Sequence, residues 1–142
     1  MPRKISIELI SSLLILLFLY ASISKWFDFK TFVGDMNNQP FPNWMTPFLV
    51  WGVPLIEVLI AVGLMFERTR TKALYGSLIL MSAFTIYTLT VLMHFFSYVP
   101  CSCGGVIKKL SWTQHLFFNL FFVVITLIAI LLRKERRVAA YA

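Results

Sequence analysis

Long apolar runs alternate with short polar clusters along the chain, and this alternation predicts the number of structural elements. Four runs stand out, at residues 5–24, 47–66, 73–98 and 115–132. A helix that crosses the hydrocarbon core of a bilayer needs about 20 residues. Each run therefore predicts one transmembrane helix. Together they predict an all-α membrane protein, a four-transmembrane-helix bundle, in which residues 1–142 form a single integral membrane domain.

The composition agrees with this prediction. Of the 142 residues, 59% are hydrophobic and 13% are charged, whereas about a quarter of the residues of a soluble domain are charged. The net charge of +7 would also suit a nucleic-acid binder, but the basic residues form short clusters between apolar runs. They do not form a basic face interleaved with aromatic residues. We therefore expect the lipid bilayer, and no nucleic acid, as a partner.

The basic clusters predict the orientation of the helices. Nine basic residues lie before the first run, between the second and third runs, or after the fourth: Arg3, Lys4, Arg68, Arg70, Lys72, Arg133, Lys134, Arg136 and Arg137. The opposite connections contain four: Lys25, Lys30, Lys108 and Lys109. Because cytoplasmic loops carry the excess of Lys and Arg, we expect both termini to be cytoplasmic and residues 25–46 and 100–114 to face outward. The first run is longer than a usual signal-peptide core, so we expect it to stay as an uncleaved span.

Cys101 and Cys103 are the two cysteines of the chain, and they follow the third run directly. Outside the cytoplasm two nearby cysteines tend to pair with each other or with a partner protein. A disulfide across one residue closes a small strained ring, and strained disulfides are the labile ones. Gly104 and Gly105 leave the sulfurs open to an approaching partner. The pair therefore predicts thiol-disulfide exchange, with an inert loop bridge or a pair of metal ligands as alternatives.

His115 is a further candidate site residue. Ser111 and Gln114 have the spacing of a capping box, which predicts that the fourth helix starts there and that His115 lies in its first turn. A helix N-terminus disfavours the imidazolium form, so a neutral His115 would be able to accept a thiol proton. Asn119 lies one turn further along the same face and would either orient it or pack between helices. The alternative for His115 is a hydrogen-bonding role at the membrane interface.

Glu57 lies in the middle of the second run, where an ionisable side chain is costly and is therefore a functional candidate. We expect the hydroxyl groups of the third run at Ser82, Thr85 and Thr88 to satisfy it. A carboxyl at this place would relay protons, or would hydrogen-bond a quinone or another small ligand. A structural hydrogen bond between helices is the alternative.

Three segments carry a resemblance to a known family: residues 20–25 (YASISK), 54–63 (PLIEVLIAVG) and 101–105 (CSCGG). With these segments the chain resembles the MauE branch of the DoxX-like membrane proteins. The resemblance implies a multi-pass protein of the bacterial inner (cytoplasmic) membrane, linked with periplasmic disulfide chemistry and thioredoxin-like partners. It carries Cys101, Cys103 and Glu57 over as site residues. Gly105 departs from the Phe-Gly ending of the narrower subfamily, so the resemblance implies a broader redox-associated role.

Three functional hypotheses follow. In the first, the chain is a membrane thiol-disulfide oxidoreductase, or its electron conduit, that acts through Cys101 and Cys103 on a thioredoxin-like extracytoplasmic protein. It has no second cysteine pair for a self-contained relay, which favours a membrane quinone or another protein as the second redox partner. In the second, it is a non-enzymatic accessory or scaffold subunit of a larger membrane complex. In the third, it is a small-solute transporter centred on Glu57.

Overall fold

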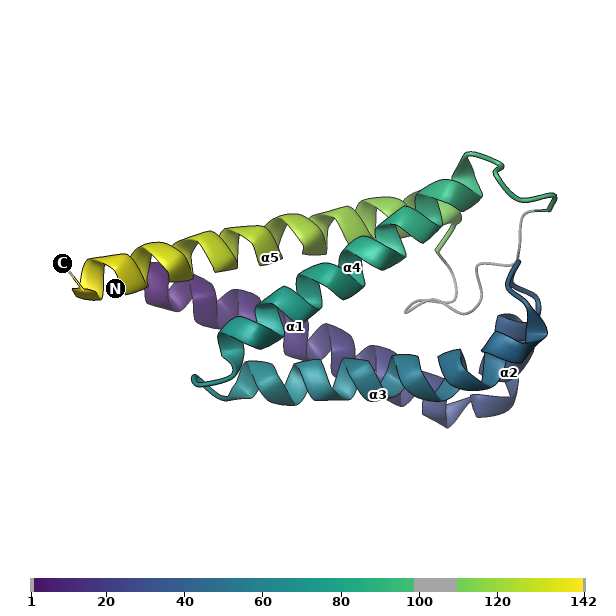
Figure 1. Ribbon diagram of the computed structural model, residues 1–142, viewed down its shortest axis with the longest axis horizontal. Coiled ribbons are helices and arrows are strands. Elements are labelled where there is room, and N and C mark those ends of the chain that lie inside the picture. Colours follow the sequence, from purple (N-terminus) through teal and green to yellow (C-terminus); the bar gives the residue numbers. More distant parts are fainter. Residues whose placement is uncertain (1, 99–109, 142) are drawn as a thin grey trace.

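The computed structural model describes residues 2–98 and 110–141, and this part of the chain consists mainly of long helices (Figure 1). In order, the elements are α1 (Pro2–Phe27), α2 (Phe29–Asn37), the 3-10 turn η1 (Asn43–Met45), α3 (Thr46–Met65), α4 (Arg70–Leu92) and α5 (Trp112–Tyr141). Among the described residues, α1, α3 with η1, α4 and α5 are long and apolar enough to cross a membrane. The predicted all-α fold with four spans is confirmed.

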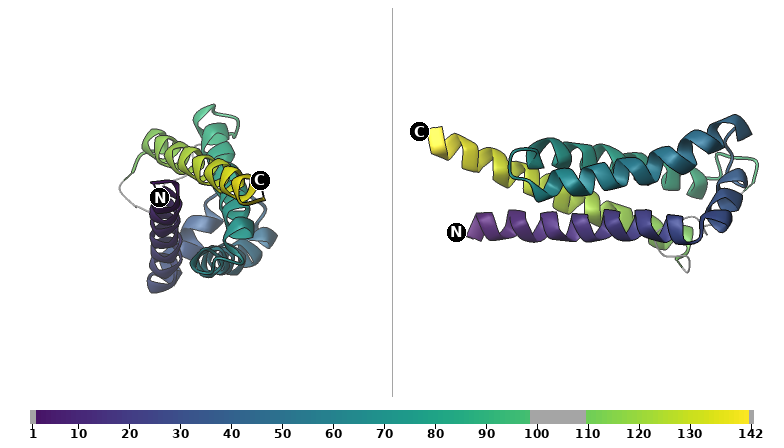
Figure 2. Two further views of the ribbon diagram at one scale, coloured as in Figure 1. Left: turned by 90° about the vertical axis from the view of Figure 1, so that its left-hand side faces the viewer. Right: turned by 90° about the horizontal axis from the view of Figure 1, so that it is seen from below.

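The two chain termini and the α3–α4 connection lie at one end of the bundle, and α2 lies at the other (Figure 1). We call these the termini end and the α2 end. The main packing partners are α1 with α3 and α4 with α5, and contacts of α3 with α4 and of α1 with α5 complete the bundle. The end-on view in Figure 2 shows these long helices grouped around a common centre.

Helices α3 and α4 come closest near the termini end. A Cβ atom placed on Gly63 would lie 3.0 Å from the Cβ of Ala73, so a side chain at this position would push the helices apart. Small residues allow such close approach between membrane helices. Toward the α2 end the axes of α3 and α4 separate (Figure 1), and the space between them is where the candidate site lies.

The bundle is apolar outside and partly polar inside. Large apolar side chains on its exterior are exposed, such as Phe48 at 74% and Ile79 at 71%. Several buried hydroxyl groups bond within their own helix: Ser77 Oγ donates to the Ala73 carbonyl at 2.9 Å, and Thr126 Oγ1 to a carbonyl one turn earlier at 2.6 Å. This distribution suits a protein whose solvent is lipid, since polar groups there must find partners inside the protein.

The first, third and fourth predicted spans have other bounds in the structure, where α5 runs from Trp112 to Tyr141 rather than over residues 115–132. Helix α1 continues past residue 24 to Phe27, and the expected outer loop contains the short helix α2. Helix α4 ends at Leu92 rather than at residue 98, because His94 adopts a left-handed φ of 53°. The backbone N–H of His94 donates to the Val91 carbonyl, and that of the following residue to the carbonyl of Thr90. This is the pattern of a Schellman motif, which ends a helix whatever the hydropathy of the residues that follow.

Candidate functional site

A cavity of about 320 Å³ lies inside the bundle toward the α2 end. Residues from all five α-helices line it, and most of its wall is apolar or aromatic. Its polar lining residues are Lys25, Asp35, Gln39, Glu57, Tyr87, Thr88, His115 and Asn119. A largely apolar cavity with a few converging polar groups has the general character of a small-molecule site.

An ion pair between Lys25 and Glu57 lies on the wall of this cavity. Lys25 Nζ is 2.6 Å from Glu57 Oε1, and their side chains are only 11% and 1% exposed. Lys25 Nζ also lies 5.9 Å from the centre of the Phe32 ring, within the range of a cation–π contact. The other carboxyl oxygen, Glu57 Oε2, is buried and has no hydrogen-bond partner among the described residues. Glu57 therefore retains an acceptor that the described part of the chain does not use.

The predicted partners of Glu57 were wrong. Thr85 Oγ1 donates to the Met81 carbonyl and Thr88 Oγ1 to the Phe84 carbonyl, each at 2.7 Å, so both hydroxyls bond within α4. Ser82 was the third predicted partner. In the described part of the chain, however, Glu57 bonds none of these three residues, and its hydrogen-bond partner is Lys25.

Lys25 is the ion-pair partner of Glu57 that sequence reasoning missed, and the lining residues Asp35, Gln39 and Tyr87 were not predicted either. Lys25 had been interpreted as a loop residue that reports topology, but α1 extends through it to Phe27. A signal was present: Lys25 follows Phe18 by seven residues and Ala21 by four, and both are buried on α1. This spacing places Lys25 on the same face of the helix. Together with the opposite charge of Glu57 in the next span, this position would have predicted an ion pair between the two residues.

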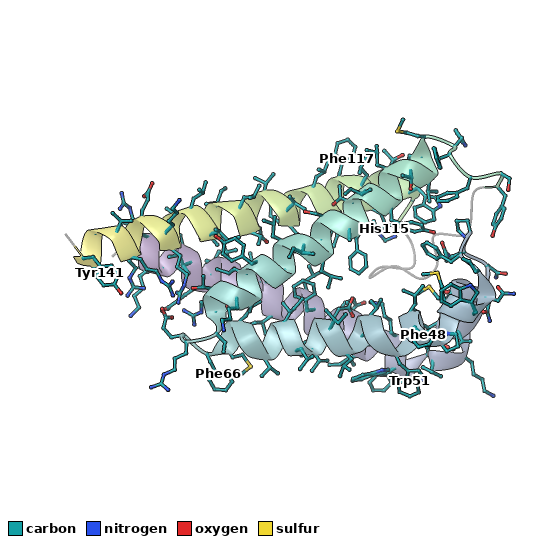
Figure 3. The ribbon with its side chains drawn as sticks, in the orientation of Figure 1. Phe48, Trp51, Phe66, His115, Phe117 and Tyr141 are labelled. Atoms are coloured by element: carbon teal, nitrogen blue, oxygen red, sulfur yellow. The ribbon has the colours of Figure 1, made fainter. Side chains whose placement is uncertain are left out.

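His115 and Asn119 reach the cavity from α5. The predicted capping box is confirmed: the Ser111 N–H donates to Gln114 Oε1 at 2.9 Å, and the Gln114 N–H donates to Ser111 Oγ at 3.3 Å. This start places His115 in the first turn, on the inner side of α5, while Phe117 points away from the bundle (Figure 3). His115 and Asn119 are each 8% exposed. The structure therefore brings His115 and Glu57 to the same cavity, which their separate motifs did not predict.

Polar and aromatic contacts tie the outer wall of the cavity together. The Tyr87 hydroxyl donates to Gln39 Oε1, which links α4 to the chain after α2. The Tyr87 ring stacks on Phe41 at 5.2 Å between centroids and meets Trp112 edge-on at 6.0 Å. Asn119 Nδ2 donates to Thr88 Oγ1 at 3.3 Å, which links α5 to α4.

Cys101 and Cys103 lie outside the described residues, so the structure tests neither their pairing nor their surroundings. In the sequence, Cys101 comes three residues after Tyr98, and Cys103 comes nine residues before Trp112. The Tyr98 hydroxyl donates to the Asn38 carbonyl at 3.2 Å, next to the end of α2, and Trp112 lines the cavity. The described residues that flank the cysteine segment thus belong to the α2 end.

A second buried cation, Arg133, lies at the termini end. Its guanidinium donates to Thr71 Oγ1 at 2.6 Å, to Glu67 Oε1 at 2.7 Å and to the Glu67 carbonyl at 2.8 Å. Partial burial raises the pKa of Glu67, but the hydrogen bond and charge of Arg133 outweigh it, with help from Arg70 and Arg136, and hold that pKa below its usual value. The cluster joins α5 to the α3–α4 connection. Arg133, predicted only as a marker of topology, is therefore also a structural residue.

Comparison with known proteins identifies the family. The profile of the methylamine utilisation protein MauE matches residues 3–132, which include the four long helices almost completely and both cysteines. Searches of curated proteins and of solved structures found no match. The wider relation to DoxX-like proteins stays a prediction. Because the profile covers far more than half of the chain, the protein belongs to the MauE family of membrane proteins.

Proposed function

We propose that this protein takes part in extracytoplasmic thiol-disulfide exchange, in which Cys101 and Cys103 exchange electrons with a thioredoxin-like partner protein. The observation that carries the proposal is the cavity with the buried Lys25–Glu57 pair, located at the end of the bundle to which the cysteine segment is attached. Titratable groups gathered in a cavity are typical of functional sites.

The charge distribution supports an outward-facing α2 end. The basic clusters around Arg3, Arg70 and Arg133 all fall at the termini end, where the chain begins and ends and where α3 turns into α4. Under the positive-inside rule this end is cytoplasmic. In a bacterial inner membrane the cysteine segment then faces the periplasm, where disulfides form and persist.

The proposed exchange needs only the two cysteine pairs. A thiolate of the reduced pair attacks one sulfur of the oxidised pair, the S–S bond of that pair breaks, and the leaving sulfur takes a proton. The mixed disulfide is then attacked by the second thiolate of the first pair. One protein leaves as a dithiol and the other holds a disulfide, so two electrons have moved between them. No other oxidant or reductant enters this step.

His115 is the proposed proton acceptor for the thiol that attacks. It lies in the first turn of α5, where the helix dipole favours the neutral imidazole and also favours a thiolate nearby. Its ring is 6.5 Å from that of Trp112, the first residue of α5. His115 is thus positioned by the same capping box that starts the helix.

The test is to follow the redox state of the cysteines in native membranes by trapping free thiols with a mass-tagging reagent. We expect the pair to titrate reversibly in glutathione buffers, at a potential above that of structural disulfides. One of the single variants Cys101→Ser and Cys103→Ser should accumulate a mixed disulfide with a thioredoxin-like protein, because the resolving thiol is missing. Ser102→Ala is the matched control and should accumulate none.

Two outcomes would contradict the exchange. The pair stays oxidised down to strongly reducing buffer, or it is never oxidised in the membrane and neither serine variant traps a partner. Either outcome would favour an accessory or scaffold subunit of a larger membrane complex, in which the cysteines do not exchange electrons with a partner.

A further inference from the structure

We propose that the cavity at the α2 end binds the ring of a membrane quinone, with Lys25 and Glu57 hydrogen-bonding one of its oxygens. The inference deepens the proposed function, because it names the second redox partner of the cysteine pair. The binding can be tested apart from the cysteines, because Lys25 and Glu57, from which the site is argued, lie outside the cysteine segment.

The hydrogen-bonding groups on the wall decide which kind of atom fits. Glu57 Oε2 is a buried acceptor without a partner among the described residues, and a buried polar atom left unpaired is costly. Beside it, the Lys25 ammonium has three N–H groups, and one of them points to Glu57 Oε1. A ligand hydroxyl whose oxygen accepts from Lys25 and whose O–H donates to Glu57 Oε2 would give both side chains a hydrogen-bond partner. The hydroxyl of a quinol does both, and the carbonyl of the oxidised quinone accepts from Lys25.

The walls exclude more polar ligands. Phe32, Phe84, Tyr87 and Trp112 all line the cavity, together with aliphatic side chains. A sugar or a nucleotide would place many of its polar groups against these aromatic and aliphatic side chains, and polar groups left unpaired there would make its transfer unfavourable. Lys25 and Glu57 neutralise each other, so the ion pair itself does not require a charged ligand. A flat, mostly apolar ring with oxygen substituents meets these conditions.

The size and position of the cavity fit a ligand that arrives from the bilayer. Its volume of about 320 Å³ is near the lower limit for small-molecule sites, so it suits one ring system rather than a phospholipid. Glu57 lies eleven residues after Thr46, the first residue of α3, which is about 16 Å along the helix. This position within the bundle favours a ligand that is soluble in an apolar environment.

Quinone chemistry also balances the exchange. When the dithiol reduces the quinone, the two cysteine sulfurs form an S–S bond and give up two electrons and two protons, and the two quinone oxygens take them to give the quinol. The reverse reaction has the same balance. In either direction the quinone is the co-reactant that a chain with one cysteine pair lacks.

The experiment measures binding of decylubiquinone and its quinol to the full chain in lipid nanodiscs. A Cys101→Ser/Cys103→Ser background removes redox turnover, and quenching of tryptophan fluorescence reports on the cavity because Trp112 lines it. We expect saturable binding. In this background Glu57→Gln should weaken quinol binding about tenfold, the equivalent of about one hydrogen bond. Glu8→Gln, an exposed carboxyl in α1, is the matched control and should change nothing.

A second pair of variants keeps the proposal testable if Glu57→Gln does not fold. Ala83→Phe adds a ring at a residue that lines the cavity, whereas Ile86→Phe adds the same ring to α4 at a residue that is 62% exposed and is not among the lining residues. We expect Ala83→Phe to abolish binding and Ile86→Phe to leave it unchanged.

Equal binding by both phenylalanine variants, or no binding above that of empty nanodiscs, would overturn the quinone site. So would a phospholipid that occupies the cavity and is not displaced by the quinone. Because binding is measured in the serine background, its result does not depend on whether the cysteine pair exchanges electrons. Quinone binding with an inert cysteine pair would refute the exchange alone, and a reversible pair without quinone binding would refute the site alone.

Discussion

Replacing Lys25 by methionine tests whether its ion pair with Glu57 holds α1 against α3. Lys25 Nζ and Glu57 Oε1 are 2.6 Å apart, and both side chains are largely withdrawn from solvent, at 11% and 1% exposure. Removal of one partner from a buried pair leaves the other charge without compensation, which costs about 3–5 kcal/mol. We therefore expect Lys25→Met to lower the free energy of unfolding by about that amount.

The measurement is reversible unfolding in mixed micelles of detergent and sodium dodecyl sulfate, followed by tryptophan fluorescence. Lys30→Met is the matched control, since Lys30 lies at the same end of the bundle in α2 and its side chain is exposed; it should leave the free energy of unfolding within about 0.5 kcal/mol of the wild type. The double variant Lys25→Met/Glu57→Leu removes both charges, and we expect it to recover most of the loss because apolar replacements of a buried pair are often neutral.

Two results would refute this reasoning. In the first, Lys25→Met and Lys30→Met unfold alike, which would mean that the pair contributes nothing to stability. In the second, the free energy of unfolding that the double variant loses equals the sum of the losses measured for Lys25→Met and Glu57→Leu singly. Additive losses are the mark of residues that do not interact, and they would show that Lys25 and Glu57 are not coupled in the membrane.

Two further predictions concern the termini end. Gly63→Leu should lower the free energy of unfolding by about 1–3 kcal/mol, because its side chain would press on Ala73; Gly52→Leu, on the same helix with open space around it, should change little in the same assay. The lowered pKa of Glu67 predicts stability that is present above its usual value of 4.5 and is lost as the pH falls below it. The unfolding midpoint should therefore drop on acidification, and Glu67→Gln should lower the midpoint at neutral pH and flatten this dependence; an unchanged acid response in the variant would exclude the Arg133 pairing as its cause.

The number and type of elements were predictable because lipid restricts the choices. Every backbone polar group in the hydrocarbon core must be bonded within its own helix, so a long apolar run has one available structure. Helix ends are set by local contacts that hydropathy does not report. The left-handed conformation at His94 stops α4 within an apolar stretch, and α1 continues through a charged residue, Lys25, because that residue finds a partner inside.

The candidate site was predictable residue by residue but not as an assembly. Glu57 was identified by its cost in an apolar run, and His115 by the capping box beside it. Their convergence on one cavity depends on how α3 and α5 each pack against α1 and α4. No short motif encodes this packing. Lys25 and Arg133 were predicted as topology signals because the positive-inside rule counts charges and does not consider the partners that each side chain can reach.

The two ionic clusters differ in how completely the described residues satisfy their hydrogen bonds, and this difference supports the proposal that the cavity is the functional site. At the termini end both carboxyl oxygens of Glu67 are bonded, one to Arg133 and the other to Arg70. At the α2 end Glu57 is far more buried, yet one of its oxygens has no partner among the described residues. A purely structural pair would gain from a second donor, which Glu67 has. In the proposed quinone site, the open acceptor of Glu57 receives its donor from the ligand.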